Sequence, residues 1–156
     1  MSERNPEAAV QELLERIVGA LGLDAEVQVS TDGETVIGNL EGEDLGLFIG
    51  RRGQTIEAVQ HLAQRMLVAD REAPKTRVVI DAAGYRAQRA EVLHQHADEA
   101  ADEALESGQP VALDAMNASE RKIVHTYLAE RGDVTTHSEG DEPDRHLVVS
   151  PASPSD

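Results

Sequence analysis

The sequence is poor in several kinds of residue, and each shortage excludes a class of protein. It has no cysteine among its 156 residues, so neither a disulfide framework nor a thiolate metal site is available. Its aromatic residues are Phe48, Tyr85 and Tyr127, too few for a surface built from stacked aromatic platforms. No apolar run approaches the roughly 20 residues that span a bilayer, and the first residues lack the pattern of a secretory signal. We therefore expect a cytoplasmic protein without membrane insertion.

Positive charge is also scarce, and it is distributed unevenly. Lysine and arginine total 14 against 30 acidic residues, for a formal net charge of -16. Residues 1–43 hold 2 bases and 10 acids, residues 44–94 hold 8 and 6, and residues 95–156 hold 4 and 14, so the net charges are -8, +2 and -10. An acidic exterior repels random polyanions, while a local basic patch still binds one. Any polyanion contact is therefore expected near the middle of the chain.

The middle of the chain contains two glycines that bracket two arginines, between two apolar runs that predict helices. The stretch reads Ile49, Gly50, Arg51, Arg52, Gly53, Gln54, Thr55 and Ile56. Glycine permits a tight turn, and the first amide groups of the following helix have no intrahelical partner and point outward. Guanidinium groups match phosphate geometry. The stretch predicts a clamp for a phosphodiester backbone, although a turn with surface arginines needs no ligand.

The first half of the chain predicts an ordered series of elements. An amphipathic helix at residues 10–21 stops at Gly22, and strands at 26–30 and 35–40 are joined by an Asp-Gly turn. The glycine-bracketed pair of helices follows, and a third strand is expected at 76–81. The predicted order is helix, strand, strand, helix, helix, strand, in a domain at residues 6–83.

The second half predicts a second small domain, at residues 84–150. A long helix from Tyr85 to about Ser107 joins the two domains; it has a thin apolar stripe and an acidic end that we interpret as a solvated face. The stripe consists of Val92, Ala97, Ala101 and Leu105. A short strand at 110–113, a helix that begins at a capping box at Asn117 and stops at Gly132, and strands at 134–138 and 145–149 follow. Residues 151–156 are expected to be a disordered tail, and the fold class is α+β.

Arg121 and His125 lie four positions apart on the predicted helix, so their side chains project from one face. Arginine there can fork onto a phosphate, and the imidazole can donate a second hydrogen bond or stack on a base. Such a pair is by itself also common on an ordinary helix surface.

The element order of the first domain, with Gly50-Arg51-Arg52-Gly53 between its last two helices, resembles a KH domain of the prokaryotic (type II) arrangement. The resemblance implies that this loop holds the backbone of about four unpaired nucleotides in a groove. By position, the groove apolars would be Ile49, Ile56 and Val59, with Val78 and Ile80 behind them. Lys75 and Arg77 would extend the positive rim, although both are also ordinary solvated residues at a strand end.

The stretch at residues 116–125, followed by Ser138-Glu139-Gly140 and Pro143-Asp144-Arg145, resembles the single-stranded nucleic-acid-binding domain named for its Arg-x-x-x-His motif. A type II KH domain followed by that domain is the arrangement of the bacterial Jag (SpoIIIJ-associated, KhpB/EloR) family, and the resemblance covers roughly residues 6–150. It implies an RNA-binding, post-transcriptional regulator linked to cell elongation and division. The second set of contacts would come from Arg121, Lys122, His125 and Arg145.

The resemblance implies no cofactor and no metal, and it implies a protein partner that is either a second copy or a small single-KH protein. Single-stranded DNA stays open as a ligand, because a clamp on phosphates does not read the 2′-hydroxyl. We expect no enzyme, since the sequence contains no recognised catalytic motif. Two alternatives remain: an adaptor that uses its KH domain for dimerisation, and a metal-dependent nuclease built on Asp70, Glu72 and Asp81.

Overall fold

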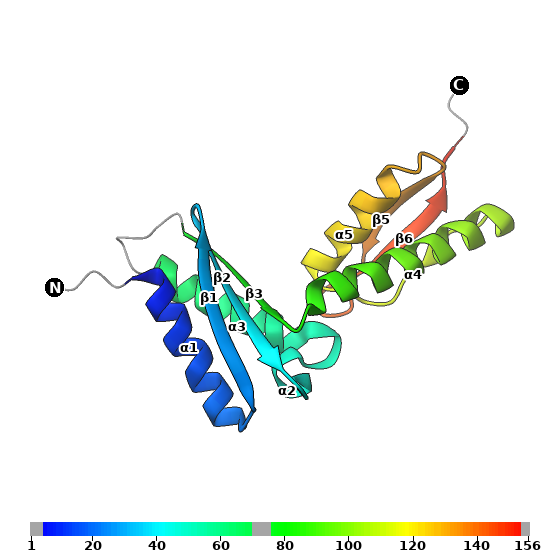
Figure 1. Cartoon of the computed structure of the whole chain (residues 1–156). Coiled ribbons are helices and arrows are strands. Elements are labelled where there is room, and N and C mark those ends of the chain that lie inside the picture. Colours follow the sequence, from blue (N-terminus) through cyan, green and yellow to red (C-terminus); the bar gives the residue numbers. More distant parts are fainter. Residues whose placement is uncertain (1–4, 70–75, 154–156) are drawn as a thin grey trace. The chain divides into compact units, whose positions relative to one another are not determined.

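A computed structural model describes residues 5–69 and 76–153 of the chain, which divides into two compact units, Met1–Arg86 and Ala87–Asp156 (Figure 1). Each unit combines helices with a small three-stranded sheet, so the predicted α+β class is confirmed. Among the described residues, no helix is both long and apolar enough to cross a membrane.

The first unit has the predicted order of elements. They are α1 (Pro6–Leu21), β1 (Ala25–Asp32), β2 (Thr35–Gly42), α2 (Gly46–Ile49), the 3₁₀ turn η1 (Arg51–Gly53), α3 (Gln54–Val68) and β3 (Arg77–Ala82). The sheet has the order β1-β2-β3, with β1 antiparallel and β3 parallel to β2. Because β3 is an edge strand, one side of its backbone faces away from the sheet.

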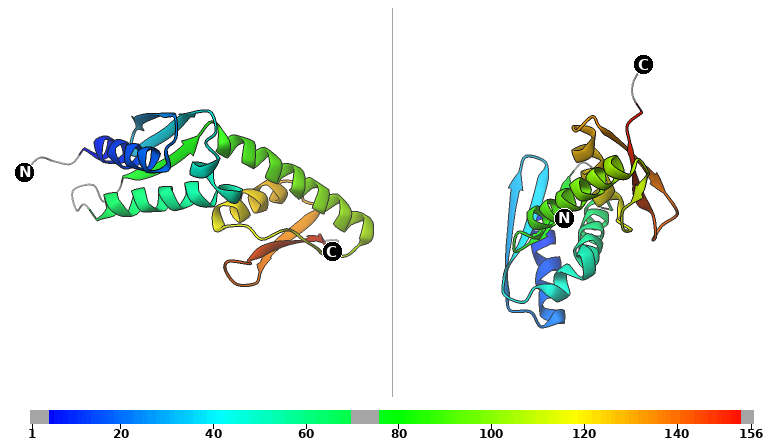
Figure 2. Two further views of the ribbon diagram at one scale, coloured as in Figure 1. Left: turned by 90° about the horizontal axis from the view of Figure 1, so that it is seen from below. Right: turned by 90° about the vertical axis from the view of Figure 1, so that its right-hand side faces the viewer.

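Helices α1 and α3 cover one face of this sheet, as both views in Figure 2 show. The alternation of buried residues in β2 and β3 places Val36, Leu40, Val78 and Ile80 on that face. Gly38 lies between them, and a Cβ there would come within 2.7 Å of Leu14 Cδ1. The absence of a side chain at this position therefore lets α1 pack directly on the sheet.

The second unit also follows the predicted order. Its elements are α4 (Tyr85–Ser107), which begins in the first unit, β4 (Val111–Ala112), α5 (Ala118–Ala129), β5 (Val134–Glu139) and β6 (His146–Pro151). The strands form an antiparallel sheet of order β4-β6-β5. The start of α5 at Asn117 is confirmed, because its side chain accepts a hydrogen bond of 2.9 Å from the Glu120 N–H. The Glu120 carboxylate pairs with Arg89 of α4 at 2.8 Å, so the structure has the N-cap but not the reciprocal half of the capping box. Helix α5 ends at Ala129, before the predicted stop at Gly132.

The apolar stripe of α4 differs from the predicted one. The buried positions are Leu93, Ala97, Ala100, Ala101 and Ala104. Leu105 is 42% exposed, so it does not belong to the packed face. The buried face is formed mainly by alanines, whose small side chains let the helix lie close to its neighbours. Leu105 is the more hydrophobic of the two neighbours and is therefore expected at the buried face. Ala104 occupies it instead, because a smaller side chain allows closer packing of the helix.

The end of the chain is ordered further than predicted. Pro151 is the last residue of β6 and pairs with Val134, and the Ala152 N–H donates to the Asp133 carbonyl at 2.9 Å. The segment expected as a tail thus begins within the sheet. Residues 154–156 lie outside the described part of the chain.

Candidate nucleic-acid interface

The turn at residues 50–53 depends on both of its glycines. Gly50 and Gly53 each have φ of +76°, and Arg52 between them has φ of +55°. A Cβ on Gly50 would lie 2.8 Å from the Thr55 backbone nitrogen, and one on Gly53 would lie 2.6 Å from the Tyr85 hydroxyl oxygen. Both positions therefore combine a left-handed backbone with no room for a side chain. The sequence pattern does not predict the contact of Tyr85 with this turn.

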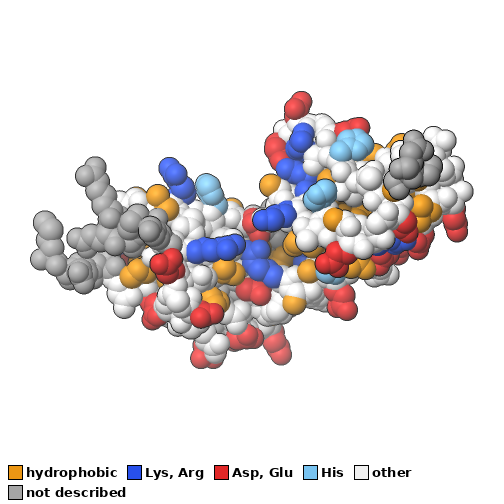
Figure 3. Space-filling view, turned by 90° about the horizontal axis from the view of Figure 1, so that it is seen from above, with side chains coloured by type: hydrophobic (Ala, Val, Ile, Leu, Met, Phe, Trp, Pro, Cys, Tyr) orange, Lys and Arg blue, Asp and Glu red, His pale blue; other side chains and the backbone are white. Residues whose placement is uncertain are grey.

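The turn presents the N-terminus of α3 together with cationic side chains. Gly53 is the residue before α3, and no side chain caps the first amide groups of the helix. The side chains of Arg51, Arg52 and Gln54 are exposed beside these amides. The positive end of the helix dipole and the guanidinium groups thus act on the same small volume, which is a favourable place for an anion. On each unit, the face drawn in Figure 3 carries lysine, arginine and histidine side chains, with acidic side chains on the same face.

The expected groove apolars lie mostly in the core. Ile56 is 0% exposed and Val59 is 7% exposed, and both pack with Val78 and Ile80 in the core under α1 and α3. The structure therefore places Ile56 where its side chain supports the turn from inside, because it follows the turn on the buried face of α3. Ile49, at the end of α2, is only partly buried.

The free edge of β3 is occupied by side chains that the sequence does not indicate. Gln64 accepts from the Val78 N–H and donates to the Thr76 carbonyl, both at 2.8 Å. Gln60 accepts from the Ile80 N–H, also at 2.8 Å. Any base that pairs with this edge has to replace one of these two glutamines from α3.

Arg86 fastens the start of α4 to the same region. Its Nε donates to the Ile80 carbonyl at 2.6 Å, its Nη1 to Glu57 at 2.6 Å and its Nη2 to Gln60 at 2.8 Å. Although Arg86 belongs to the positive middle of the sequence, its charge is matched internally. The net charge of +2 counted for residues 44–94 therefore overstates how much positive charge that segment presents on the surface.

Two of the nuclease candidates and one rim residue, Asp70, Glu72 and Lys75, lie outside the described residues. The Asp81 carboxylate accepts from the Ala82 and Arg86 N–H groups, at 2.9 and 3.2 Å. The described part of the chain holds no cluster of three or more residues suited to a metal ion. Asp81 thus organises the turn into α4.

Arg77 is exposed, but it lies at the start of β3, whereas Tyr85, which touches the turn at Gly53, follows the other end. A strand of this length separates its ends by roughly 16 Å. The structure therefore does not bring Arg77 together with the arginines of the turn.

In the second unit, side chains from α5 and β5 line a shallow cavity of about 350 Å³. Its lining comprises Ala118, Arg121, Lys122, His125, Thr136, His137, Ser138 and Leu147. Three predicted site residues thus meet in one place, and Thr136 faces them from the neighbouring strand. Lys122, His125 and His137 are exposed, and the His125 ring contacts the Thr136 hydroxyl.

Arg121 and Arg145 are engaged with the protein itself. Arg121 is only 11% exposed; its Nη1 donates to the Met116 carbonyl at 2.6 Å and its Nη2 to Glu142 at 2.8 Å. Arg145 is half-buried and donates to the Gly140 carbonyl at 2.6 Å, and it does not line the cavity. The two arginines therefore hold the connection between β5 and β6.

The acidic end of α4 is partly engaged as well. Arg131 pairs with Asp98 and Asp102 of α4, both at 3.1 Å, and with Asp133 at 3.0 Å. The Tyr127 hydroxyl donates to Asp98 at 2.6 Å, and this hydrogen bond raises the pKa of Tyr127 above its usual value. The hydrogen bond from Arg131 lowers the pKa of Asp133. This part of α4, expected to be a solvated face, thus fastens the helix to the end of α5.

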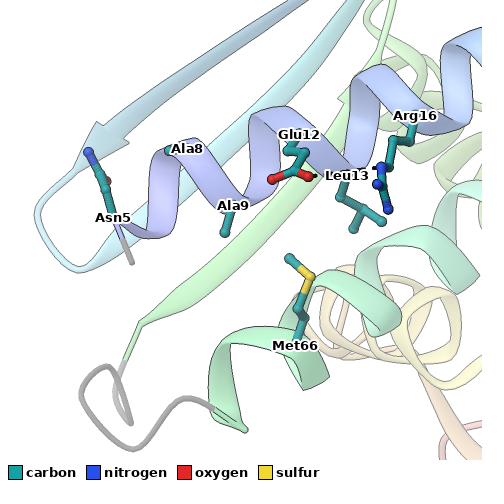
Figure 4. Close-up of a pocket in the computed structure, with 7 residues that line it drawn as sticks. All are labelled: Asn5, Ala8, Ala9, Glu12, Leu13, Arg16 and Met66. Atoms are coloured by element: carbon teal, nitrogen blue, oxygen red, sulfur yellow. Dashed lines mark ion pairs between the residues drawn. The ribbon is translucent and has the colours of Figure 1, made fainter. Parts of the chain in front are cut away.

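A second cavity, of about 330 Å³, lies between α1 and α3 (Figure 4). Its walls are largely small or apolar side chains of α1 facing Met66 of α3, with the Arg16 and Glu12 ion pair at 3.9 Å beside them. None of the predicted nucleic-acid contacts lines this cavity.

The turn on the first unit and the α5 face on the second define a class of protein, a chain of two small α+β modules that each present cationic side chains. Comparison with known families agrees: residues 7–80 match the KhpA/KhpB KH domain, and residues 91–151 match the R-three-H domain, which is named for the Arg-x-x-x-His motif. The chain belongs to the KhpB family.

Its similar proteins include three bacterial relatives that are each named RNA-binding protein KhpB. Identity is 34% with that of Clostridium symbiosum, 37% with that of Lactiplantibacillus plantarum and 37% with that of Bacillus subtilis. The alignments cover 89%, 91% and 88% of this chain, but 63%, 44% and 66% of the respective relatives. The chain thus spans about half to two thirds of the length of these relatives.

Proposed function

We propose that the protein binds single-stranded nucleic acid, with RNA as the ligand, and that the turn at residues 50–53 holds the phosphate backbone. The observation that carries this proposal is the geometry of the turn: two glycines without room for a Cβ place exposed arginines beside the uncapped start of α3. Backbone amides and guanidinium groups are the donors that phosphate oxygens accept from. RNA is favoured because the similar bacterial proteins are named as RNA-binding.

Affinity in this proposal comes from the backbone of the strand more than from stacked bases. The chain has only three aromatic residues, and Phe48 is fully buried while Tyr85 packs against Gly53. Tyr127 stacks on His94 with ring centres 4.1 Å apart. These side chains are all engaged in packing, so base recognition falls to hydrogen bonds at the groove edges.

A second contact on the α5 face supports the same function. Lys122 and His125 are exposed on one side of the 350 Å³ cavity. A nucleic-acid strand bound there gains a second phosphate contact in addition to the one at the turn. Two weak sites on one chain bind a longer nucleic-acid strand more tightly than either site binds alone. Once the strand is held at the first site, binding at the second site is an intramolecular step.

Binding of a short fluorescent single-stranded oligoribonucleotide tests the proposal. We expect Arg51→Asp to weaken binding at least tenfold and Arg51→Asp with Arg52→Asp to abolish it, since acidic groups at the turn repel the phosphate. The matched control is Arg16→Asp, which makes the same change of charge on α1 at a side chain that is 80% exposed. Equal losses for Arg51→Asp and Arg16→Asp would mean that only net charge matters and that the turn is no clamp.

We also propose a protein partner, either a second copy or a small single-KH protein. The supporting observation is exposed apolar surface on α3, where Leu62 is 53% exposed and Val68 is 46% exposed. Sedimentation equilibrium of the chain alone and with such a partner distinguishes the two.

A further inference from the structure

Gln64 covers hydrogen-bonding groups at the outer edge of the first sheet. Its Oε1 accepts from the Val78 N–H and its Nε2 donates to the Thr76 carbonyl, both at 2.8 Å. Strand β3 is the last strand of the order β1-β2-β3, so these backbone groups face away from β2. One carboxamide thus bridges two residues of β3 on the side where a further strand would otherwise pair.

The pattern that the Gln64 side chain presents, a hydrogen-bond acceptor beside a donor, is also found on the edges of nucleobases. Adenine, for example, offers its N7 acceptor beside its N6 amino group. Unpaired bases are recognised through hydrogen bonds on such edges. A base and the Gln64 carboxamide are therefore competitors for the same Val78 N–H and Thr76 carbonyl.

Gln64 lies along the helix that begins at the turn at residues 50–53. Gly53 directly precedes α3, and the helical rise places Gln64 roughly 16 Å further along the helix axis. Gln60 lies between them and accepts from the Ile80 N–H at 2.8 Å. A strand that leaves the turn along α3 therefore reaches the covered edge of β3 within a few nucleotides.

The two glutamines differ in how firmly they are held. Gln60 Oε1 accepts from Arg86 Nη2 at 2.8 Å as well as from the Ile80 N–H, so its displacement also breaks a hydrogen bond to a charged donor. The two bonds of Gln64 to β3 join neutral groups, and its side chain is half-buried. A base replaces such bonds at little net cost, and the released side chain regains its rotamer freedom.

We propose that Gln64 is an autoinhibitory side chain of the first unit. In the free protein it closes the edge of β3, and a nucleobase of the bound single strand pairs with Val78 and Thr76 only when it displaces the carboxamide. This inference rests on the proposed function, because it concerns a strand that is held at the turn. The phosphate contacts at the turn form without this exchange, whereas the base contact at β3 requires it.

Removal of the carboxamide tests the competition. We expect Gln64→Ala to bind a short fluorescent single-stranded oligoribonucleotide about 3- to 10-fold more tightly than the wild type, since the base no longer exchanges with a side chain. Thermal unfolding should show a lower stability, because the Val78 N–H and the Thr76 carbonyl lose their partner in the free protein. A purely structural cover predicts the loss of stability alone, so unchanged or weaker binding would overturn the proposal.

An abasic strand of the same length is the control for the base. It keeps the phosphates but has no base for the edge of β3, so Gln64→Ala should bind it as tightly as the wild type does. Gln11→Ala is the matched variant, because it makes the same change on α1, where Gln11 donates to Glu15. An equal gain of affinity for the abasic strand, or an equal gain in Gln11→Ala, would overturn the proposal.

Nuclear magnetic resonance of the wild-type protein covers the case in which Gln64→Ala does not fold. With a saturating base-bearing strand, the side-chain amide resonances of Gln64 should shift while the Val78 N–H stays protected from hydrogen exchange, because one partner replaces another. With the abasic strand, both should stay as in the free protein. Gln64 resonances that respond to neither strand, or equally to both, would overturn the proposal.

The wild-type protein and Arg51→Asp are measured in the same series. Failure of the wild type to bind either strand would contradict the proposed function. Binding that Arg51→Asp weakens and Gln64→Ala leaves unchanged would contradict only this inference.

Discussion

The backbone of the turn at residues 50–53 is shaped by steric exclusion at single positions. Gly50 and Gly53 share φ of +76°, yet each is closed off by a different neighbour, Thr55 in one case and Tyr85 in the other. Arg52 adopts φ of +55° without being glycine, at a cost of about 1 kcal/mol or more. A strained arginine between two required glycines indicates that the direction of its side chain matters more than local stability.

The two parts of the glycine requirement can be separated experimentally. Gly22→Ala adds only the backbone strain, since φ is +66° and ψ is +32° there and no atom lies within 4 Å of an added Cβ. Gly53→Ala, at a similar φ of +76° and ψ of +15°, adds a clash with the Tyr85 side chain as well. We expect the free energy of unfolding to fall by about 1 kcal/mol in Gly22→Ala and by about 2–4 kcal/mol in Gly53→Ala. Urea unfolding measures both, and equal losses would contradict the role of the clash.

At the scale of elements, side chains from one helix complete the hydrogen bonding of another element. Gln60 and Gln64 of α3 satisfy the edge of β3, and Arg86 of α4 reaches the same edge through the Ile80 carbonyl. An open strand edge invites pairing with other chains, and covering it with side chains limits that hazard. The same cover leaves hydrogen-bonding groups along β3 that a base could engage only by exchange with these side chains.

The contact between α4 and the end of α5 predicts a specific dependence on acid. The hydrogen bond from Arg131 lowers the pKa of Asp133, so the carboxylate stabilises the fold fully above its unfolded pKa of about 3.9. That stabilisation is lost as the pH falls through the lower pKa of the folded state. We expect Asp133→Asn to be less stable than wild type near neutral pH, with a difference that shrinks toward pH about 3. Thermal unfolding across this range measures it.

The control for this prediction is a double-mutant cycle with Arg131→Gln. In that background the hydrogen bond is absent, so Asp133→Asn should leave the pH dependence nearly unchanged. If Asp133→Asn instead changed the stability by the same amount in both backgrounds, the acid sensitivity would belong to another group.

At the scale of the whole molecule, a net charge of -16 restricts binding to places where cations are concentrated. The turn at residues 50–53 and the α5 cavity lie on separate units, so one strand has to be long enough to reach both before their contributions combine. The acidic remainder of the surface weakens any association that lacks these contacts.

This arrangement predicts an effect of strand length. For a strand of about four nucleotides, which the turn alone can hold, Lys122→Gln should leave the affinity unchanged. For strands several times longer, the same variant should weaken binding and reduce the slope of log affinity against log salt by about 0.7, the share of one phosphate on a single strand. Fluorescence anisotropy over a series of lengths measures both. A loss of equal size at every length would contradict a two-site grip.

The sequence by itself determined the order of the elements, the turn at residues 50–53 and the capping of α5 by Asn117. These features depend on interactions between neighbouring residues: apolar periodicity, the conformational freedom of glycine and a side chain that reaches a nearby amide. The family also follows from motifs that can be read in order along the chain.

Only the tertiary structure decided which candidate side chains are exposed and which are engaged within the protein. Ile56 is enclosed in the core, Arg121 is held by Glu142 from a distant segment, and His125 meets Thr136 of the neighbouring strand. The sequence offers every polar group as a potential contact, because it does not show which partners the fold brings within hydrogen-bonding distance. Packing and pairing between segments far apart in the chain make that selection, and they engage the motif arginine with Met116 and Glu142.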